Sequence, residues 1–217
     1  LDSPAERKKG ISAREYLAGM KQLAQNPSIL LLVLVAGMRS MTQQGLHVFL
    51  PIYLTNELGL SSALAGLYLS VTQTAGMIGT PIAGSISDRS GRKRVLTAGL
   101  FSTSVVLFVL AYFQLDWFFI TGLAFLCFFL YAVRPVIWAW VLDLSPKELG
   151  GSTVSFFSGS QSLLSSLSPV ICGFIADRWG ILSAFYFLAG TVMVANLIVL
   201  AIRVENKITP ALVEEPA

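Results

Sequence analysis

The sequence is poor in charge, in cysteine and in histidine, and each shortage argues against a class of protein. Only 12% of the 217 residues are charged, and this is about half the share found in soluble domains. The two cysteines, Cys127 and Cys172, lie in apolar runs and imply neither a disulfide framework nor a metal site. The only histidine, His47, lies far from any serine motif, and no run carries a carboxylate near its middle. We therefore expect no enzyme, no cofactor and no bound metal.

What the chain has instead is apolar sequence, gathered into six long runs. Most of these runs reach or exceed the roughly 20 residues that a helix needs to cross a bilayer, and all are longer than a barrel strand. We predict an all-α membrane protein with six transmembrane helices. The predicted helices are Ile29 to Leu54, Ala63 to Ser87, Val95 to Phe113, Trp117 to Leu142, Val154 to Ala176 and Leu182 to Ile202.

The cations fix an expected orientation. Twelve of the 15 lie before the first run, between the second and third, after the fourth or after the sixth. Cytoplasmic loops carry an excess of Lys and Arg, so both ends of the chain should face the cytoplasm of a plasma (inner) membrane. This distribution also argues against nucleic acid as the partner of a chain with net charge +3.

The remaining segments flank the predicted bundle of residues 27–204. Residues 1–26 are predicted to be a cytoplasmic linker, and residues 205–217 a cytoplasmic tail. Within the linker, Ser12 and Glu15 have capping-box spacing, which favours a short amphipathic helix on the membrane face. A flexible tether is the alternative.

A basic segment from Gly84 to Leu96 separates the second and third runs, with the spacing G-x-x-x-D-R-x-G-R-K-x-x-L. Turn chemistry accounts for part of it, because Asp88 and Ser90 can bond local backbone amides and Gly91 can adopt a left-handed conformation. Four cations within six residues would also hold the loop on the cytoplasmic side.

The spacing also resembles the signature loop of the major facilitator superfamily of secondary transporters. By that resemblance, Asp88 would dock near a helix end in another half of the protein, with Arg89 and Arg92 in supporting ion pairs. The implied gating motif consists of Gly84, Asp88, Arg89, Gly91, Arg92 and Lys93.

A second copy of this pattern supports the resemblance. Residues 173–180 match residues 84–91 at Gly, Ile, Asp, Arg and Gly, with an offset of 89 residues or three runs. An odd number of crossings places the copies on opposite sides of the membrane, so we predict a 3+3 inverted repeat. Ile181 and Leu182 follow the second copy where the first has cations, so Asp177 and Arg178 are expected only to shape a turn.

The resemblance implies the C-terminal half of a twelve-helix transporter, with its helices seven to twelve. The partner would be a missing N-terminal half of six helices, and because the chain starts with Leu instead of Met, we expect that it is cut from a longer protein. A homodimer of six-helix chains is the alternative.

Polar residues inside the runs are candidates for a solute site. Arg39, Gln43 and His47 recur every four residues, so they share one helix face. The cost of burying a charge in lipid predicts that Arg39 faces a cavity or a partner. Serines in the fifth run fit either helix packing or the wall of a polar pathway. The predicted substrate-binding residues are Arg39, Gln43, Gln73, Tyr131, Arg134, Trp138 and Gln161.

Two arginines that stay charged favour an organic anion or an amphiphilic solute, moved by alternating access. A drug exported in exchange for protons is the competing substrate class, because the aromatic residues would serve it equally well. A receptor or scaffold that keeps the fold without moving solute is a further alternative.

Overall fold

The computed structural model describes residues 25–113, 116–145 and 150–202, which are almost entirely helical. The predictions for the linker, its amphipathic helix and the tail therefore lie outside the described residues, apart from the linker's last two. The helices, in chain order, are α2 (Pro27–Ile52), which continues into the π-helical turn η1 (Tyr53–Glu57), α3 (Ser62–Ser90), α4 (Arg92–Phe113), α5 (Asp116–Leu144), α6 (Gly150–Ser166), α7 (Ser168–Trp179) and α8 (Ile181–Ala201).

Each predicted run coincides with a helical rod, and α6 and α7 form one rod that is interrupted at Leu167. Five of the described rods are long and apolar enough to cross a membrane. The rod outside this set is α3, which has the length but carries polar residues such as Gln73, Thr74 and Thr80. The fold is all-helical and membrane-type, whereas the sixth crossing stays a prediction.

Local sequence explains where two of the helices begin. The side chain of Asn26 accepts hydrogen bonds from the first amides of α2, and Pro27 occupies the first helical position. The hydroxyl of Ser61 accepts from the amide of Leu64 at the start of α3. These caps satisfy amide groups that have no partner inside their own helices.

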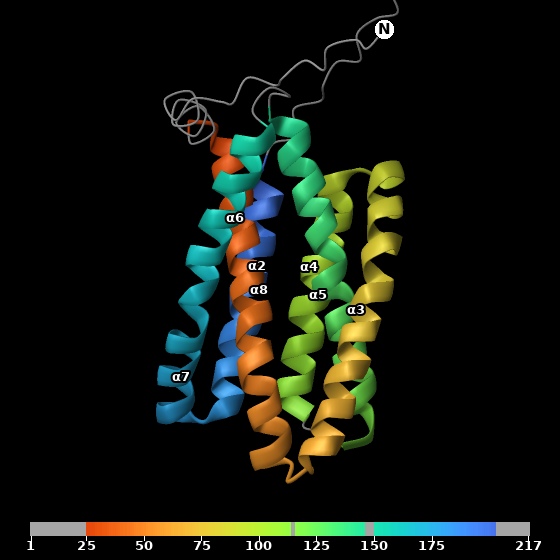
Figure 1. Cartoon of the computed structure of the whole chain (residues 1–217), viewed down its shortest axis with the longest axis vertical. Helices are drawn as coiled ribbons and strands as arrows, with labels where there is room; N and C mark the ends of the chain where they lie inside the picture. The colour runs from red at the N-terminus through yellow and green to blue at the C-terminus, as the bar shows by residue number, and fades with distance from the viewer. Residues whose placement is uncertain (1–24, 114–115, 146–149, 203–217) are drawn as a thin grey trace, which may run out of the picture.

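Two connections between antiparallel helices consist of one residue each. Gly91 joins α3 to α4, and Gly180 joins α7 to α8. The two turns lie at opposite ends of the bundle, as the prediction of an inverted repeat requires (Figure 1). We call these ends the Gly91 end and the Gly180 end. The described chain both starts and finishes at the Gly91 end.

The packing also follows the repeat. Helix α3 lies along α5, α6 with α7 lies along α2, and α4 lies along α8. Gly76 and Gly79 allow the first approach, because a Cβ at Gly79 would come within 2.7 Å of the carbonyl oxygen of Phe128. These two glycines therefore have a packing role, whereas a Cβ at Gly66 or Gly84 would meet open space.

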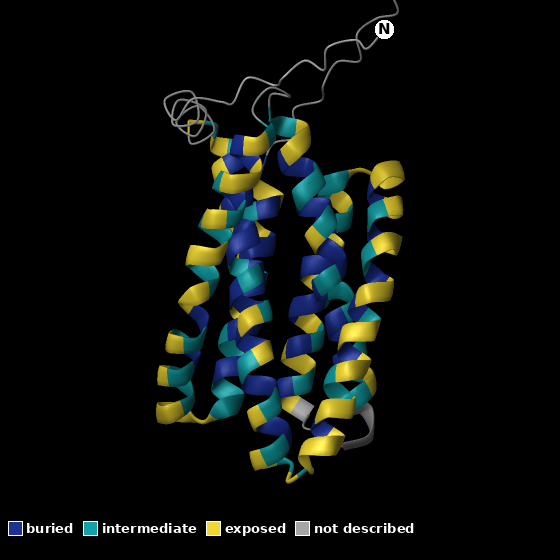
Figure 2. Cartoon of the chain, in the orientation of Figure 1, coloured by how far each residue is buried: buried dark blue, intermediate teal, exposed yellow. Residues whose placement is uncertain are grey.

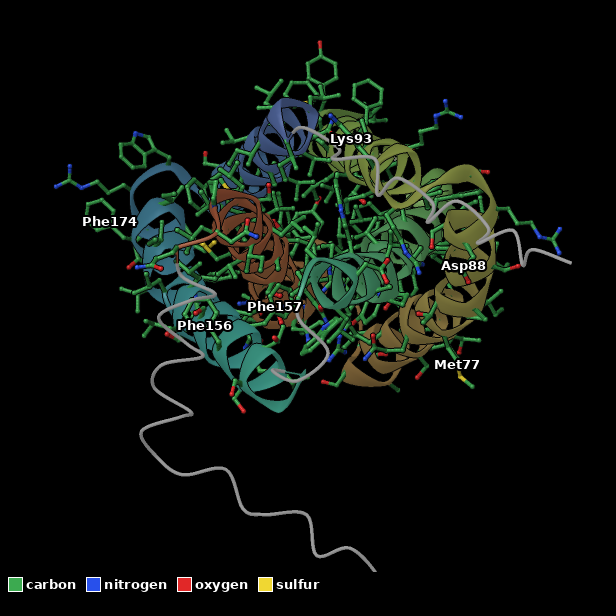
Figure 3. The ribbon with its side chains drawn as sticks, turned by 90° about the horizontal axis from the view of Figure 1, so that it is seen from above. Met77, Asp88, Lys93, Phe156, Phe157 and Phe174 are labelled. Atoms are coloured by element: carbon green, nitrogen blue, oxygen red, sulfur yellow. The ribbon has the colours of Figure 1, made fainter. Side chains whose placement is uncertain are left out.

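Buried side chains form two clusters along the bundle axis. The cluster nearer the Gly91 end includes Leu32, Val136 and Phe157, and the other includes Leu126 and Leu188. The outer faces carry exposed side chains (Figure 2). Figure 3 shows Met77 and Phe174, both more than half exposed, pointing away from the bundle. Such an apolar exterior suits lipid or another membrane segment.

Candidate functional site

Two pockets lie against the middle of α2, and Gln43 lines both of them. The arginine pocket has a volume of about 190 Å³ and is lined by Arg39, Ser40, Gln43, Gln44, Arg134, Gln161, Ser162 and Ser165. The tyrosine pocket has a volume of about 260 Å³ and is lined by Gln43, Leu46, His47, Leu50, Leu69, Thr72, Gln73, Cys127, Leu130 and Tyr131. Polar groups from α2, α3, α5 and α6 therefore converge inside an apolar bundle.

Arg39 lies between the pockets with its side chain almost completely buried. Its Nε and Nη2 atoms donate to the backbone carbonyl of Leu130, at 3.0 and 2.7 Å. The guanidinium carbon also lies 5.8 Å from the centre of the Tyr131 ring. The expectation of a cavity or a partner for this charge is confirmed, because Arg39 has both. Pro135 follows Arg134 and cannot donate to a carbonyl of the preceding turn, yet the guanidinium that binds a carbonyl in this part of α5 belongs to Arg39.

Arg134 differs from Arg39 because it is exposed within the arginine pocket. It forms no salt bridge with any residue that the structure describes. None of the residues that line this pocket is acidic. Arg134 thus presents a cation and its N–H donors to whatever fills the pocket, and a carboxylate matches that geometry well.

Gln161 closes the arginine pocket on the α6 side. Its amide nitrogen donates to the hydroxyl of Ser40, which ties α6 to α2. Ser162 and Ser165 also line the pocket, whereas Ser168 donates to the carbonyl of Met41 at 2.6 Å. The serines of the fifth run therefore include a helix-packing residue and pocket-lining residues, while the polar pathway stays a prediction.

The tyrosine pocket contains a chain of hydrogen bonds across three helices. The hydroxyl of Tyr131 on α5 donates to the side-chain oxygen of Gln73 on α3, at 2.6 Å. The same hydroxyl lies 2.6 Å from Nε2 of His47 on α2. A hydroxyl has one hydrogen to give, so His47 must donate from Nε2. Its other ring nitrogen is then the acceptor when the ring is neutral.

Six of the seven predicted substrate-binding residues line these pockets. The seventh, Trp138, packs edge-on against Phe157 with ring centres 4.7 Å apart, and it lines neither pocket. Sequence reasoning missed Ser40, Gln44 and Thr72. Gln44 carried a usable signal, because it is a second amide directly after Gln43 in an apolar run.

The predicted gating motif forms a network at the Gly91 end. Arg92 contacts Asp88 one turn away on α3, donates to the Ser87 hydroxyl at 2.8 Å and reaches Asp143 on α5 at 3.2 Å. Asp88 was expected to bond a local backbone amide, but its recorded contact is this ion pair. Lys93 donates to the carbonyls of Leu200 and Ile202 at 2.8 and 2.7 Å.

The glycine of this motif has the expected positive φ. Gly91 has φ 92° and ψ 140°, so its ψ lies outside the left-handed helical region predicted for this turn, while its positive φ is one that other residues rarely adopt. Its amide donates to the carbonyl of Ser87 at 3.0 Å. Arg89 is exposed, and Gly84 lies in open space. The network joins the ends of four helices, while its role in gating stays a prediction.

Membrane helices in an inverted repeat around central polar pockets define an integral membrane protein with the architecture of a solute transporter. Comparison with known proteins gives the family. Residues 31–216 match the model of the Major Facilitator Superfamily, and the chain belongs to that family.

Curated relatives carry transporter names. The chain is 31% identical over 140 residues to the probable galactarate/D-glucarate transporter GudP of Pseudomonas putida, covering 60% of this chain and 30% of that protein. It is 31% identical over 163 residues to the multidrug resistance protein MdtG of Klebsiella pneumoniae, covering 73% of this chain and 39% of that protein. The chain thus spans less than half the length of these relatives.

Solved structures support the same fold. The crystal structure of the Escherichia coli fucose:proton symporter FucP aligns with a TM-score of 0.72 over 93% of this chain and 50% of that chain, at 19% identity. The POT family transporter PepTSo aligns with a TM-score of 0.68 over 80% of this chain and 37% of that chain, at 17% identity.

Proposed function

We propose that this protein is a secondary active transporter that moves a carboxylate-bearing organic solute, such as a sugar acid, by alternating access. The observation that carries the proposal is the arginine pocket, where Arg134 is exposed among amide and hydroxyl groups with no acidic residue in the lining. A sugar acid has one or two carboxylates and several hydroxyls. Arginine would hold the carboxylate, and Gln43, Gln44 and Gln161 would bond the hydroxyls.

The names of several relatives agree with this chemistry. Besides GudP, a hexuronate transporter of Bacillus subtilis is 30% identical over 151 residues, covering 64% of this chain and 36% of that protein. The roles of the two arginines would differ. Arg39 is committed to the Leu130 carbonyl and would act by positioning, whereas Arg134 would contact solute.

The test is uptake of radiolabelled D-glucarate by proteoliposomes that contain the full-length protein, compared among wild type, Arg134→Gln and Arg134→Lys. A hydrogen bond to a charged group contributes about 1.5 to 3 kcal/mol, so Arg134→Gln should lower kcat/KM about tenfold or more. Arg134→Lys should retain part of the activity. Arg178→Gln, at the Gly180 end, is the matched control. Unchanged D-glucarate transport in Arg134→Gln would overturn the assignment.

A drug is the second candidate solute, and the tyrosine pocket favours it. That pocket is larger than the arginine pocket and combines Leu46, Leu50 and Leu69 with Tyr131, and several relatives are named MdtG. Export of a lipophilic cation coupled to protons would require a titrating group. If this candidate is right, Tyr131→Leu will reduce drug efflux while Arg134→Gln will not.

A receptor or scaffold with the same fold would bind solute without exchanging it. Counterflow separates the two functions, because labelled solute accumulates against excess internal unlabelled solute only when the protein carries solute both ways. Binding of D-glucarate without counterflow would favour the receptor.

We further propose that the Gly91 end faces the cytoplasm of a plasma membrane and that a second six-helix unit completes the cavity. Arg89, Arg92, Lys93 and Arg94 lie at the Gly91 end, and Arg178 lies at the other. FucP has about twice the length that this chain covers. A membrane-impermeant thiol reagent should label Ser183→Cys, but not Ser90→Cys, in whole cells, and the intact mass of the natively purified protein tests the second unit.

A further inference from the structure

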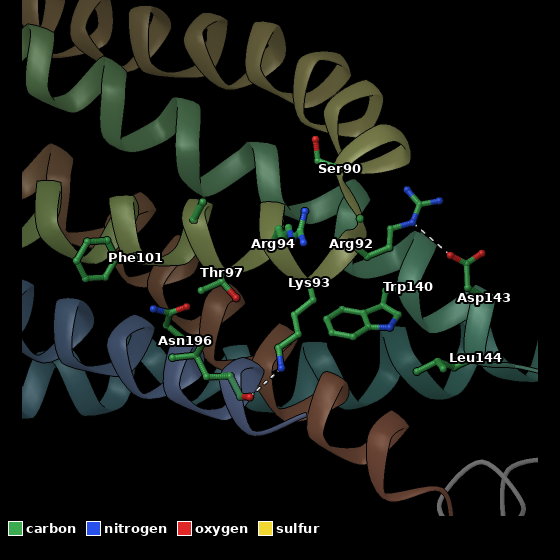
Figure 4. A pocket seen from close by; sticks show the side chains of 13 residues that line it. Ser90, Arg92, Lys93, Arg94, Thr97, Phe101, Trp140, Asp143, Leu144 and Asn196 are labelled. Atoms are coloured by element: carbon green, nitrogen blue, oxygen red, sulfur yellow. Dashed lines mark hydrogen bonds and ion pairs between the residues drawn. The ribbon is translucent and has the colours of Figure 1, made fainter. Parts of the chain in front are cut away.

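A third pocket lies at the Gly91 end, apart from the two central pockets. Its volume is about 1050 Å³, and it opens between the first turns of α4 and the last turns of α5 and α8. Figure 4 shows the lining side chains, with Arg92 and Lys93 on the side of Asp143 and with Thr97, Asn196 and Phe101 towards the other side. The proposed transport function leaves this pocket unexplained.

The lining changes from cationic to less polar along α4. Three cations and one carboxylate, Asp143, line the pocket near the start of that helix, and Asp143 is already neutralised by Arg92 at 3.2 Å, whereas Phe101 lies at the other side and is half exposed on the outer face. Phe101 lies nine residues further along α4 than Arg92, which corresponds to about 13 Å of helix. An occupant that fits this gradient has an anionic head and an apolar body.

Arg94 is available for the anionic head. It is exposed and makes no ion pair within the described part of the chain, whereas Lys93 and Arg92 are held by carbonyls and carboxylates. The pocket also lies at the first turn of α4, whose amide groups favour an anion.

Two polar atoms in the lining need a partner. Asn196 is only 4% exposed, and its side-chain oxygen has no hydrogen-bond partner in the described residues. The buried hydroxyl of Thr97 is also unpartnered there. Buried polar atoms without partners are rare and costly. The Asn196 oxygen needs a donor, so the occupant must carry hydroxyl or N–H groups beside its anionic charge.

We propose that this pocket binds an anionic phospholipid with a glycerol headgroup, of the phosphatidylglycerol type. The phosphate lies near Arg94 and the start of α4, the headgroup hydroxyls meet Asn196 and Thr97, and an acyl chain runs along Phe101. The site lies where the candidate spans of α4 and α8 begin and end, which is the level of lipid headgroups.

The experiment is native mass spectrometry of the detergent-purified full-length protein with equimolar phosphatidylglycerol and phosphatidylcholine of identical acyl chains. The expected result is retention of phosphatidylglycerol at least tenfold above phosphatidylcholine. Arg94→Gln and Asn196→Leu should each reduce that ratio about tenfold or to unity. Arg89→Gln is the matched control, because it removes an exposed cation at the same end but outside the pocket, and it should leave the ratio unchanged.

Two additional ligands identify the recognised group. Phosphatidic acid has the phosphate without the headgroup glycerol and should bind more weakly than phosphatidylglycerol, while free glycerol 1-phosphate should not displace the lipid. Equal retention of the two phospholipids would overturn the proposal, as would an equal loss in Arg89→Gln. An Asn196→Leu variant that is more stable than wild type and keeps the wild-type lipid ratio would also overturn the proposal. The Asn196 oxygen would then lack a hydrogen-bond partner without being a site for the headgroup.

Discussion

The two single-residue turns share a backbone and differ in almost everything attached to it. Gly91 has φ 92° and ψ 140°, and Gly180 has φ 84° and ψ 160°. Each amide donates to the carbonyl four residues earlier, at 3.0 and 2.9 Å. After Gly91, Arg92 and Lys93 contact the ends of α3, α5 and α8. After Gly180, the next two residues, Ile181 and Leu182, are apolar. Glycine sets the shape of such a turn, and the residues after it set what the turn is joined to.

The largest effect should come from breaking the shared shape. Gly91→Ala and Gly180→Ala each force a side chain into a conformation that costs about 1 to 3 kcal/mol. We expect both variants to lower the midpoint of thermal unfolding in detergent by similar amounts. Gly190→Ala is the control, because a Cβ there meets open space and its φ is ordinary. Loss of stability at only one turn would refute the equivalence.

The next effect concerns a contact that only the Gly91 turn makes. Lys93→Met removes two hydrogen bonds to the last carbonyls of α8, and we expect a loss of about 1 kcal/mol after allowing for partial exposure. Arg94→Met loses the same charge one residue later without these bonds, so its unfolding midpoint should stay near the wild-type value. Equal losses in the two variants would mean that net charge, not the cap of α8, is what matters.

A smaller effect is expected from the ion pair between Arg92 and Asp143, which is partly exposed. A double-mutant cycle of Arg92→Gln and Asp143→Asn should give a coupling of about 0.5 to 1 kcal/mol in chemical denaturation. The Gly180 end has Ile181 where the first copy has Arg92, so a cycle of its charged neighbours, Arg178→Gln and Asp177→Asn, should give none. A coupling free energy at both the Gly91 end and the Gly180 end would show that the two turns share an ion pair as well as a backbone conformation.

The smallest effect should be at Arg178, whose guanidinium carbon lies 5.3 Å from the centre of the exposed Phe174 ring. Arg178→Ala should lower stability by about 0.5 kcal/mol, the size of an exposed cation–π contact. Solute uptake should be unchanged. A fall in uptake would assign the Gly180 turn a gating role that its sequence did not predict.

Length and hydropathy were enough to predict the helical rods, and the offset of 89 residues was enough to predict the inverted repeat. Helical periodicity also brought Arg39, Gln43 and His47 to one face, where the pockets lie. These features depend on spacing along one helix, which the sequence displays directly.

Other features depend on which residue of another helix a side chain contacts. The periodicity of one helix does not predict that residue. By helical spacing Trp138 lies on the same face as Arg134. In the structure, however, it packs edge-on against Phe157 of α6, beside the buried cluster nearer the Gly91 end. Arg39 was expected to have a partner, but the carbonyl of Leu130 became identifiable only once α2 and α5 were placed side by side. The interruption at Leu167 likewise lies one residue before Ser168, whose hydroxyl bonds across to α2.

The single-residue turns also have a mechanical consequence. A connection of one glycine, bonded back to Ser87 on one side and followed at once by a new helix, leaves no slack between α3 and α4. The facing ends of α3 and α4 are therefore held one residue apart, and so are those of α7 and α8. Any displacement of α4, whose Lys93 is bonded to the end of α8, must be shared by the start of that turn, whereas the rod formed by α6 and α7 is already interrupted at Leu167.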